Sequence, residues 1–168
     1  MNFILLTFIS CLILFCFICL GIGKFGLLHS YSAYATEWDK TVPIKNLNLW
    51  SIITFFAGVL LLPVLLQYSE GHILQFLGFF TPIYLIGVAL TPKFASDKKE
   101  FKYHTAFASL CALCAFLFII FVLGKYGCII ASLIVVLIAS TLSKTLKKSL
   151  TFWLEMVMFL SMYLALII

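Results

Sequence analysis

Two side chains that can exchange protons lie in otherwise apolar parts of the chain, and they are the first candidates for chemistry. Glu155 lies in the run FWLEMVMFL, and His104 opens another apolar run. A charge at the centre of a bilayer costs about 2.5–3.5 kcal/mol on insertion scales, so we expect Glu155 to face protein and to be protonated or partnered. We predict that Glu155 and His104 hydrogen-bond to each other, directly or through one water, and form a ligand or proton site.

Further polar candidates come from the connection after the first apolar run and from the third run. His29, Ser32 and Asp39 lie in the first connection, which should meet the starts of the fourth and sixth runs at one membrane face. Gln75 joins them because it shares a helical stripe with Gly78 and Pro82 in the third run. The alternative interpretation is that the polar residues of the connection belong to an ordinary solvated loop and that Glu155 snorkels to the interface.

The cysteines do not form a recognisable metal motif. Five of the six lie inside apolar runs, and Cys128 begins another. Cysteine in such a context behaves as a small hydrophobic residue. Cys111 and Cys114 share a helix face, but they lack the second ligand pair of a structural zinc site. We therefore predict packing roles and no metal site, and the sequence indicates no particular cofactor.

The elements that carry these residues follow from composition. The chain has 168 residues, of which 64% are hydrophobic and 10% charged, and its mean hydropathy is +1.20, which is far outside the range of a soluble domain. A spanning helix needs about 20 mostly apolar residues. The chain therefore predicts an all-α integral membrane bundle, a single domain of about six transmembrane helices, at residues 2–20, 49–66, 73–90, 104–123, 127–142 and 150–168.

Lysine placement predicts the orientation of the bundle. All eleven basic residues are lysines, and ten of them fall after the first, third and fifth spans, which leaves only Lys125 on the other side. Basic loops stay in the cytoplasm, so we expect these three loops to be cytoplasmic in a multi-pass protein, most simply of a bacterial inner membrane. The net charge of +5 then reflects topology and attraction to lipid headgroups, and it gives no reason to expect nucleic acid as a partner.

Small residues predict which face of the fourth span packs inward. His104, Ala108, Cys111 and Ala115 form one helical stripe. Helices associate in lipid by close approach of small residues, so this face should contact other helices. A leucine at Ala108 should then overpack the interface at a cost of about 1–3 kcal/mol.

Several segments resemble an uncharacterised family of small polytopic membrane proteins from gut bacteria. The likeness covers most of the chain, and it rests on SYSAYATEWD, TPKF, KYHTAF and KKSLTFWLEMVMFLSMYLALI. The layout is also similar to that of the six-span DRAM-like group, with a polar segment after the first span and a histidine opening the fourth. Both resemblances imply the arrangement of spans, and neither implies a reaction, ligand or partner.

Three classes of function remain open from the sequence. The leading one is transport, or the binding of a small ligand or lipid, in an intramembrane polar pocket near the cytoplasmic face. Six short spans would have to form a homo-oligomer to make a wide pathway. The second class is a non-catalytic membrane subunit, or an immunity or assembly factor. The third is a lipid-active intramembrane enzyme that uses His and Glu, although no nucleophile motif such as GxSxG is present.

Overall fold

The protein is built from helices throughout the part that the structure describes. The computed structural model describes residues 2–41, 48–91, 94–145 and 148–168. The prediction of an all-helical chain is confirmed for these residues. The elements are α1 (Phe3–Phe25), α2 (Ala33–Thr41), α3 (Leu49–Tyr68), α4 (Gln75–Ala89), α5 (Lys98–Leu117), the π-helical turn η1 (Phe118–Val122), α6 (Tyr126–Leu142) and α7 (Leu150–Ile167).

Four helices are long and apolar enough to cross a membrane. They are Phe3–Phe25, Leu49–Tyr68, Lys98–Val122 and Leu150–Ile167. The two remaining apolar helices, α4 and α6, have 15 and 17 residues. All six apolar helices overlap with spans predicted from the sequence, but only four of the six are long enough by themselves to cross a membrane.

The start of α5 differs from the sequence prediction. The sequence predicts a loop for the charged stretch before His104, yet the helix begins at Lys98. Asp97 explains this start, because its carboxylate accepts hydrogen bonds from the backbone N–H groups of Lys99 at 2.7 Å and Glu100 at 3.4 Å. An aspartate at this position satisfies N–H groups that have no partner inside the helix.

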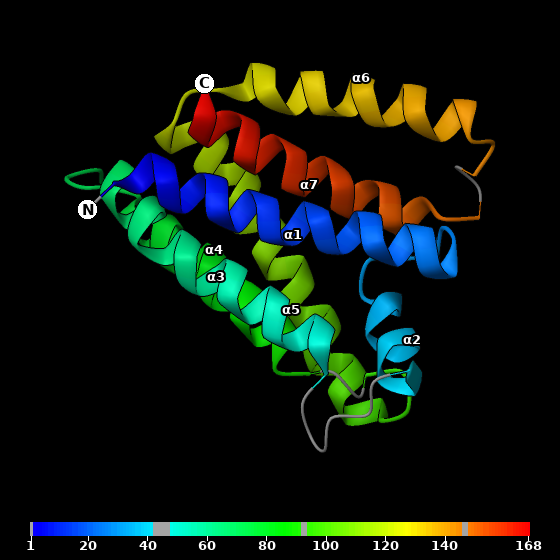
Figure 1. Cartoon of the computed structure of the whole chain (residues 1–168). Coiled ribbons are helices and arrows are strands. Elements are labelled where there is room, and N and C mark those ends of the chain that lie inside the picture. The colour runs from blue at the N-terminus through cyan, green and yellow to red at the C-terminus, as the bar shows by residue number, and fades with distance from the viewer. Residues whose placement is uncertain (1, 42–47, 92–93, 146–147) are drawn as a thin grey trace.

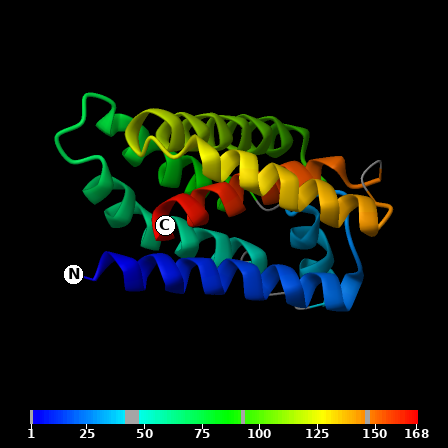
Figure 2. The same cartoon turned by 90° about the horizontal axis from the view of Figure 1, so that it is seen from above.

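α7 lies at the centre of the arrangement. It runs between α1 and α6 and also contacts α5 (Figures 1 and 2). Its buried residues follow almost continuously from Met156 to Met162, which is what a helix with neighbours on several sides requires. α6, by contrast, packs mainly against α7 and leaves most of its apolar side chains exposed.

Glycines allow α3 and α4 to approach closely. A Cβ added at Gly78 would lie 2.8 Å from the carbonyl oxygen of Leu65, and one added at Gly58 would lie 2.8 Å from Cγ1 of Ile86. Such contacts are shorter than carbon atoms tolerate. Close approach through small residues is a common way for helices to associate in lipid.

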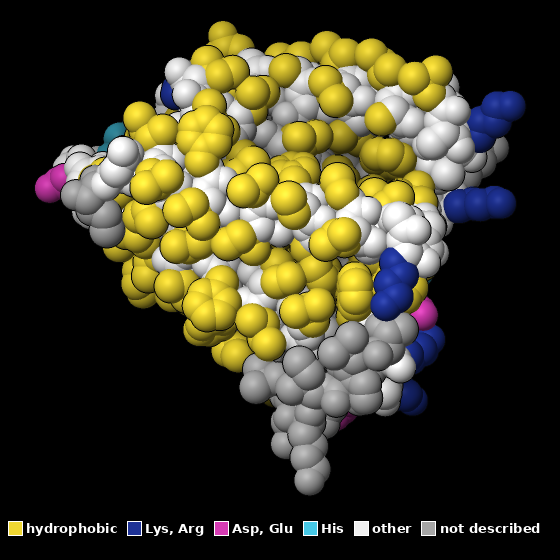
Figure 3. Space-filling model, in the orientation of Figure 1, with side chains coloured by type: hydrophobic (Ala, Val, Ile, Leu, Met, Phe, Trp, Pro, Cys, Tyr) yellow, Lys and Arg dark blue, Asp and Glu magenta, His cyan; other side chains and the backbone are white. Residues whose placement is uncertain are grey.

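The surface is apolar along the helices and basic at one end. Hydrophobic side chains cover most of the visible face, and most of the visible lysines gather at the end where α1 finishes and α7 begins (Figure 3). Every apolar helix has exposed side chains of at least one of the types Leu, Ile and Phe. Such a surface suits a lipid environment, in which apolar side chains face outward without penalty.

Candidate functional site

The connection after α1 is folded into the bundle instead of lying on its surface. All residues from Ser30 to Ala35 are at most 7% exposed. We call residues 30–35 the inserted segment. The Ser30 hydroxyl accepts a hydrogen bond at 3.1 Å from the N–H of Ala33, the first residue of α2. A buried polar segment must find hydrogen-bond partners inside the protein, and it finds them on three helices.

His104 joins the inserted segment to the end of α4. Its Nε2 lies 2.8 Å from the Ser32 hydroxyl, and its Nδ1 lies 3.0 Å from the Thr91 hydroxyl. The imidazole stacks on Phe94 with a centroid distance of 4.2 Å. His104 is only 6% exposed, so its orientation is fixed by two hydrogen bonds and a stacked ring.

The neighbours of His104 determine which nitrogen carries its proton. The hydroxyl of Thr91 donates to the carbonyl oxygen of Val88 at 2.9 Å, so its oxygen accepts from Nδ1–H of His104. A neutral imidazole has one donor and one acceptor nitrogen. Nε2 is then the acceptor, and the hydroxyl of Ser32 donates to it.

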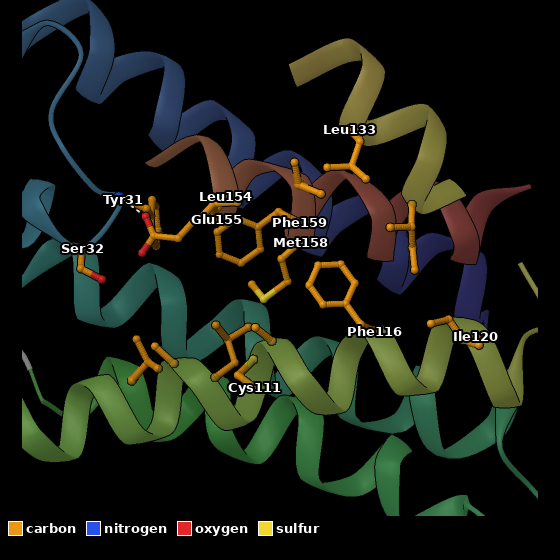
Figure 4. Close-up of a pocket in the computed structure, with 16 residues that line it drawn as sticks. Tyr31, Ser32, Cys111, Phe116, Ile120, Leu133, Leu154, Glu155, Met158 and Phe159 are labelled. Atoms are coloured by element: carbon orange, nitrogen blue, oxygen red, sulfur yellow. Dashed lines mark hydrogen bonds between the residues drawn. The ribbon is translucent and has the colours of Figure 1, made fainter. Parts of the chain in front are cut away.

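Glu155 joins the inserted segment to α7. Its Oε2 accepts a hydrogen bond from the backbone N–H of Tyr31 at 2.5 Å (Figure 4). A second bond runs nearby, from the N–H of Phe152 to the carbonyl oxygen of His29 at 3.0 Å. The first turns of α7 and the start of the inserted segment are therefore held together by two bonds. Oε1 of Glu155 has no hydrogen-bond donor among the residues that the structure describes.

The hydrogen bond expected between Glu155 and His104 is not formed directly, and its alternative form through one water stays a prediction. Both ring nitrogens of His104 are engaged by hydroxyl groups. Glu155 and His104 instead bind consecutive residues, Tyr31 and Ser32. The sequence correctly predicted that both side chains would meet the connection after the first span, but it did not predict that this connection would lie between them.

Two further contacts hold the inserted segment against α3. The hydroxyls of Tyr31 and Thr54 are 2.8 Å apart, and Nδ2 of Asn48 donates to the carbonyl oxygen of Ala35. Burial raises the pKa of the Tyr31 hydroxyl above its ordinary value, so this group remains neutral. Trp50, at the start of α3, packs on the rings of Tyr31 and His104. α3, α5 and α7 therefore all contribute to positioning the inserted segment.

A cavity of about 550 Å³ begins beside the inserted segment. It extends over α7 between α5 and α6 (Figure 4). Ser32 and Glu155 line its polar end. Its body is lined by apolar side chains, among them Phe116, Met158 and Leu133. Its size lies within the range of about 300–1,000 Å³ that is typical of small-molecule sites.

The mouth of the cavity lies on the apolar surface. Three of the side chains that line the cavity, Ile120, Leu133 and Leu154, are 38%, 47% and 57% exposed. They belong to η1, α6 and α7. A molecule would therefore enter the cavity across the apolar surface, between these helices.

The inward stripe of α5 is largely confirmed. His104, Cys111 and Ala115 are buried. Ala108 is partly buried and lines the cavity together with Cys111. The overpacking expected from a leucine at Ala108 does not follow, because this side chain borders empty space.

The structure does not bring Gln75 or the side chain of His29 to this site, and the side chain of Asp39 cannot be placed. Gln75 is exposed at the start of α4. The turn before it follows Tyr68, the last residue of α3, whose hydroxyl donates to the carbonyl oxygen of Leu166 at the far end of α7 from Glu155. The side chain of His29 is exposed, and only its carbonyl oxygen takes part. Asp39 falls in α2, but its side chain lies outside the described residues.

Sequence reasoning missed several residues that complete the site. Thr91 marks the end of a helix in the sequence, and in the structure it also orients His104. The apolar lining of Phe116 and Met158 gave no signal, because such residues are common on every helix of this chain. A polar residue just past the end of one helix and a histidine near the start of the next is the pattern that points to the bond between Thr91 and His104.

The described residues contain no group of three or more His, Cys, Asp or Glu side chains placed to hold a metal ion. Comparison of the chain with protein-family models, with curated proteins and with solved structures gives no match. The function of the site has to be inferred from its own geometry.

Proposed function

We propose that this protein is a multi-pass membrane protein whose cavity binds a single-chain amphiphile drawn from the bilayer. The observation that carries the proposal is the composition of the cavity wall: an apolar body between α5, α6 and α7, and one polar end at Ser32 and Glu155. Ligand sites commonly combine a mostly apolar lining with a few placed polar groups. An amphiphile has the same division between tail and headgroup.

The membrane topology is part of the proposal. At a rise of 1.5 Å per residue, α4 and α6 are only about 22 and 26 Å long, so they cross a hydrocarbon core of about 30 Å with the help of their flanking turns. Six crossings place the lysine-rich end of the bundle on one side. We assign that side to the cytoplasm, in a bacterial inner membrane, because basic loops are retained there.

The depth of the polar end supports an amphiphile as the ligand. Glu155 is the sixth residue of α7, about 8 Å along the helix from its start at the lysine-rich end. A headgroup at Glu155 would lie just inside the cytoplasmic interface. The tail would then run along α7 in the direction of the bilayer centre, where the wall is formed by Phe116 and Ile120.

One observation favours a second candidate, a non-catalytic membrane subunit or assembly factor. His104 and Oε2 of Glu155 both hold the inserted segment, which is a structural role. A protein whose polar residues serve only to fix its fold could present that fold to a partner. Such a role does not need the cavity, nor Oε1 of Glu155, which has no donor among the described residues.

A photoreactive hexadecanol tests the proposal in proteoliposomes. Labelling at the bilayer-facing surface cannot be saturated, whereas labelling in a cavity is abolished by excess unlabelled hexadecanol. A phenylalanine at Ala112, which lines the cavity, should remove the saturable fraction. The same change at Ala106, an exposed residue of the same helix, should leave it intact. Labelling that cannot be saturated in the unmodified protein would refute the proposal.

A further inference from the structure

With Glu155 ionised, the described polar side chains at the end of the cavity, Ser32 and Glu155, offer hydrogen-bond acceptors and no unused donor. Oε1 of Glu155 has no donor among the described residues. The Ser32 hydroxyl uses its proton on Nε2 of His104, as the tautomer of that ring requires, so its remaining lone pairs are available beside the cavity. Two acceptors from different elements therefore border the same empty space (Figure 4).

The charges around the cavity select among headgroups. Glu155 is the one ionisable carboxyl group among the described residues of the wall, and none of those residues is Lys, Arg or His. A phosphate or carboxylate headgroup would meet Glu155 without a compensating cation, and such like charges repel each other. A hydroxyl headgroup could bond to these acceptors but would bring no charge to pair with the carboxylate.

A primary ammonium group is the best match for these acceptors. It carries three N–H donors and has no acceptor, and its hydrogen bonds to a carboxylate are charge-assisted. It would also compensate a carboxylate that apolar surroundings otherwise leave unpaired. We propose that the ligand of this cavity is a single-chain amphiphile with a primary amine headgroup, bound by Oε1 of Glu155 and Oγ of Ser32. This inference rests on the amphiphile-binding function proposed above.

Competition among three probes of equal chain length tests the headgroup. Hexadecylamine, hexadecanol and palmitate would each compete with the photoreactive hexadecanol in liposomes of phosphatidylcholine. We expect the amine to compete at a concentration about tenfold or more below that of the alcohol, because of its charge-assisted bonds. Palmitate should be the weakest of the three. This ranking needs no variant, so it can be measured even if substitutions at the site impair folding.

Glu155→Gln then tests whether Glu155 causes the preference for the amine over the alcohol. The amide oxygen of the substituted side chain can still accept the hydrogen bond from Tyr31, so the tie between α7 and the inserted segment can be retained. In this variant, hexadecylamine and hexadecanol should compete at about the same concentration. Glu70→Gln is the matched control, because Glu70 is exposed in the turn between α3 and α4 and bonds Gln67.

The outcomes separate the two proposals. If all three probes compete equally, or palmitate competes best, the headgroup inference is overturned while amphiphile binding stands. An amine preference that survives Glu155→Gln in folded protein overturns the assignment to Glu155. If no probe competes and no labelling can be saturated, the amphiphile-binding function itself fails.

Discussion

Removing the hydroxyl of Ser32 should destabilise the bundle through His104. Ser32 and His104 are 5% and 6% exposed, and their bond is 2.8 Å long. In Ser32→Ala, Nε2 of His104 loses its donor while Nδ1 remains bonded to Thr91, so the ring cannot turn to find another partner without breaking that bond. The substitution therefore leaves a buried acceptor unpaired.

The size of the effect follows from the position of the bond. A buried polar group without a partner costs about 1–3 kcal/mol. Ser32 borders the cavity, and a water molecule entering there can partly replace the hydroxyl. We therefore expect Ser32→Ala to lower the free energy of unfolding by about 1–2 kcal/mol. Ser109→Ala, at an exposed position of α5, should change it by less than about 0.5 kcal/mol.

A double-mutant cycle measures the bond itself. Unfolding in mixed detergent micelles with increasing SDS would be followed for Ser32→Ala, His104→Phe and the double variant. Phenylalanine keeps a flat ring but accepts no such hydrogen bond, so Ser32→Ala should cost little in that background, with a coupling of about 1–2 kcal/mol. The proposed role of the bond would be refuted if Ser32→Ala lowered the free energy of unfolding equally with and without His104→Phe, or by no more than Ser109→Ala does.

Two further predictions concern packing and topology. Gly78→Ala should lower the free energy of unfolding by about 1–3 kcal/mol in the same assay, because its Cβ would lie 2.8 Å from the backbone oxygen of Leu65. A Cβ at Gly23 would meet nothing within 4 Å, so Gly23→Ala should be neutral or slightly stabilising. A large loss at Gly23 or none at Gly78 would contradict the helix contact. In a background without the native cysteines, Lys98→Cys should react with an impermeant maleimide only from the cytoplasmic side and Glu70→Cys only from the opposite side, and labelling of both from one side would contradict the six-span topology.

The helices could be predicted from the sequence because each depends on local composition. Apolar runs of about 20 residues are visible directly, and all six became helices. The early start of α5 was also readable, since Asp97 is followed three residues later by Glu100, a pattern typical of a helix N-terminus. The prediction instead assigned these residues to a loop, because lysines avoid the hydrocarbon core. α2 was missed because a short polar helix carries no comparable apolar signal.

The site could be predicted only in part, because it depends on contacts between distant segments. The cost of a carboxylate in an apolar helix correctly indicated that Glu155 would face protein. Its partner is a backbone N–H of Tyr31, and a backbone donor exists at almost every residue, so no side-chain pattern could identify it. Gln75 was predicted to join the site but is exposed. A helical stripe shows which residues share one side of a helix, but it does not show at which end of the helix that side meets its neighbours.

The position of the saturable label tests the central claim most directly. After photolabelling with the reactive hexadecanol, peptide mapping should place the fraction that excess hexadecanol abolishes on Phe116, Ile120 and Leu133, which line the cavity. Leu113 of α5 and Ile134 of α6, both exposed, should carry only the label that excess hexadecanol leaves unchanged. A saturable label on Leu113 and Ile134 but not on the cavity wall would contradict amphiphile binding between α5, α6 and α7.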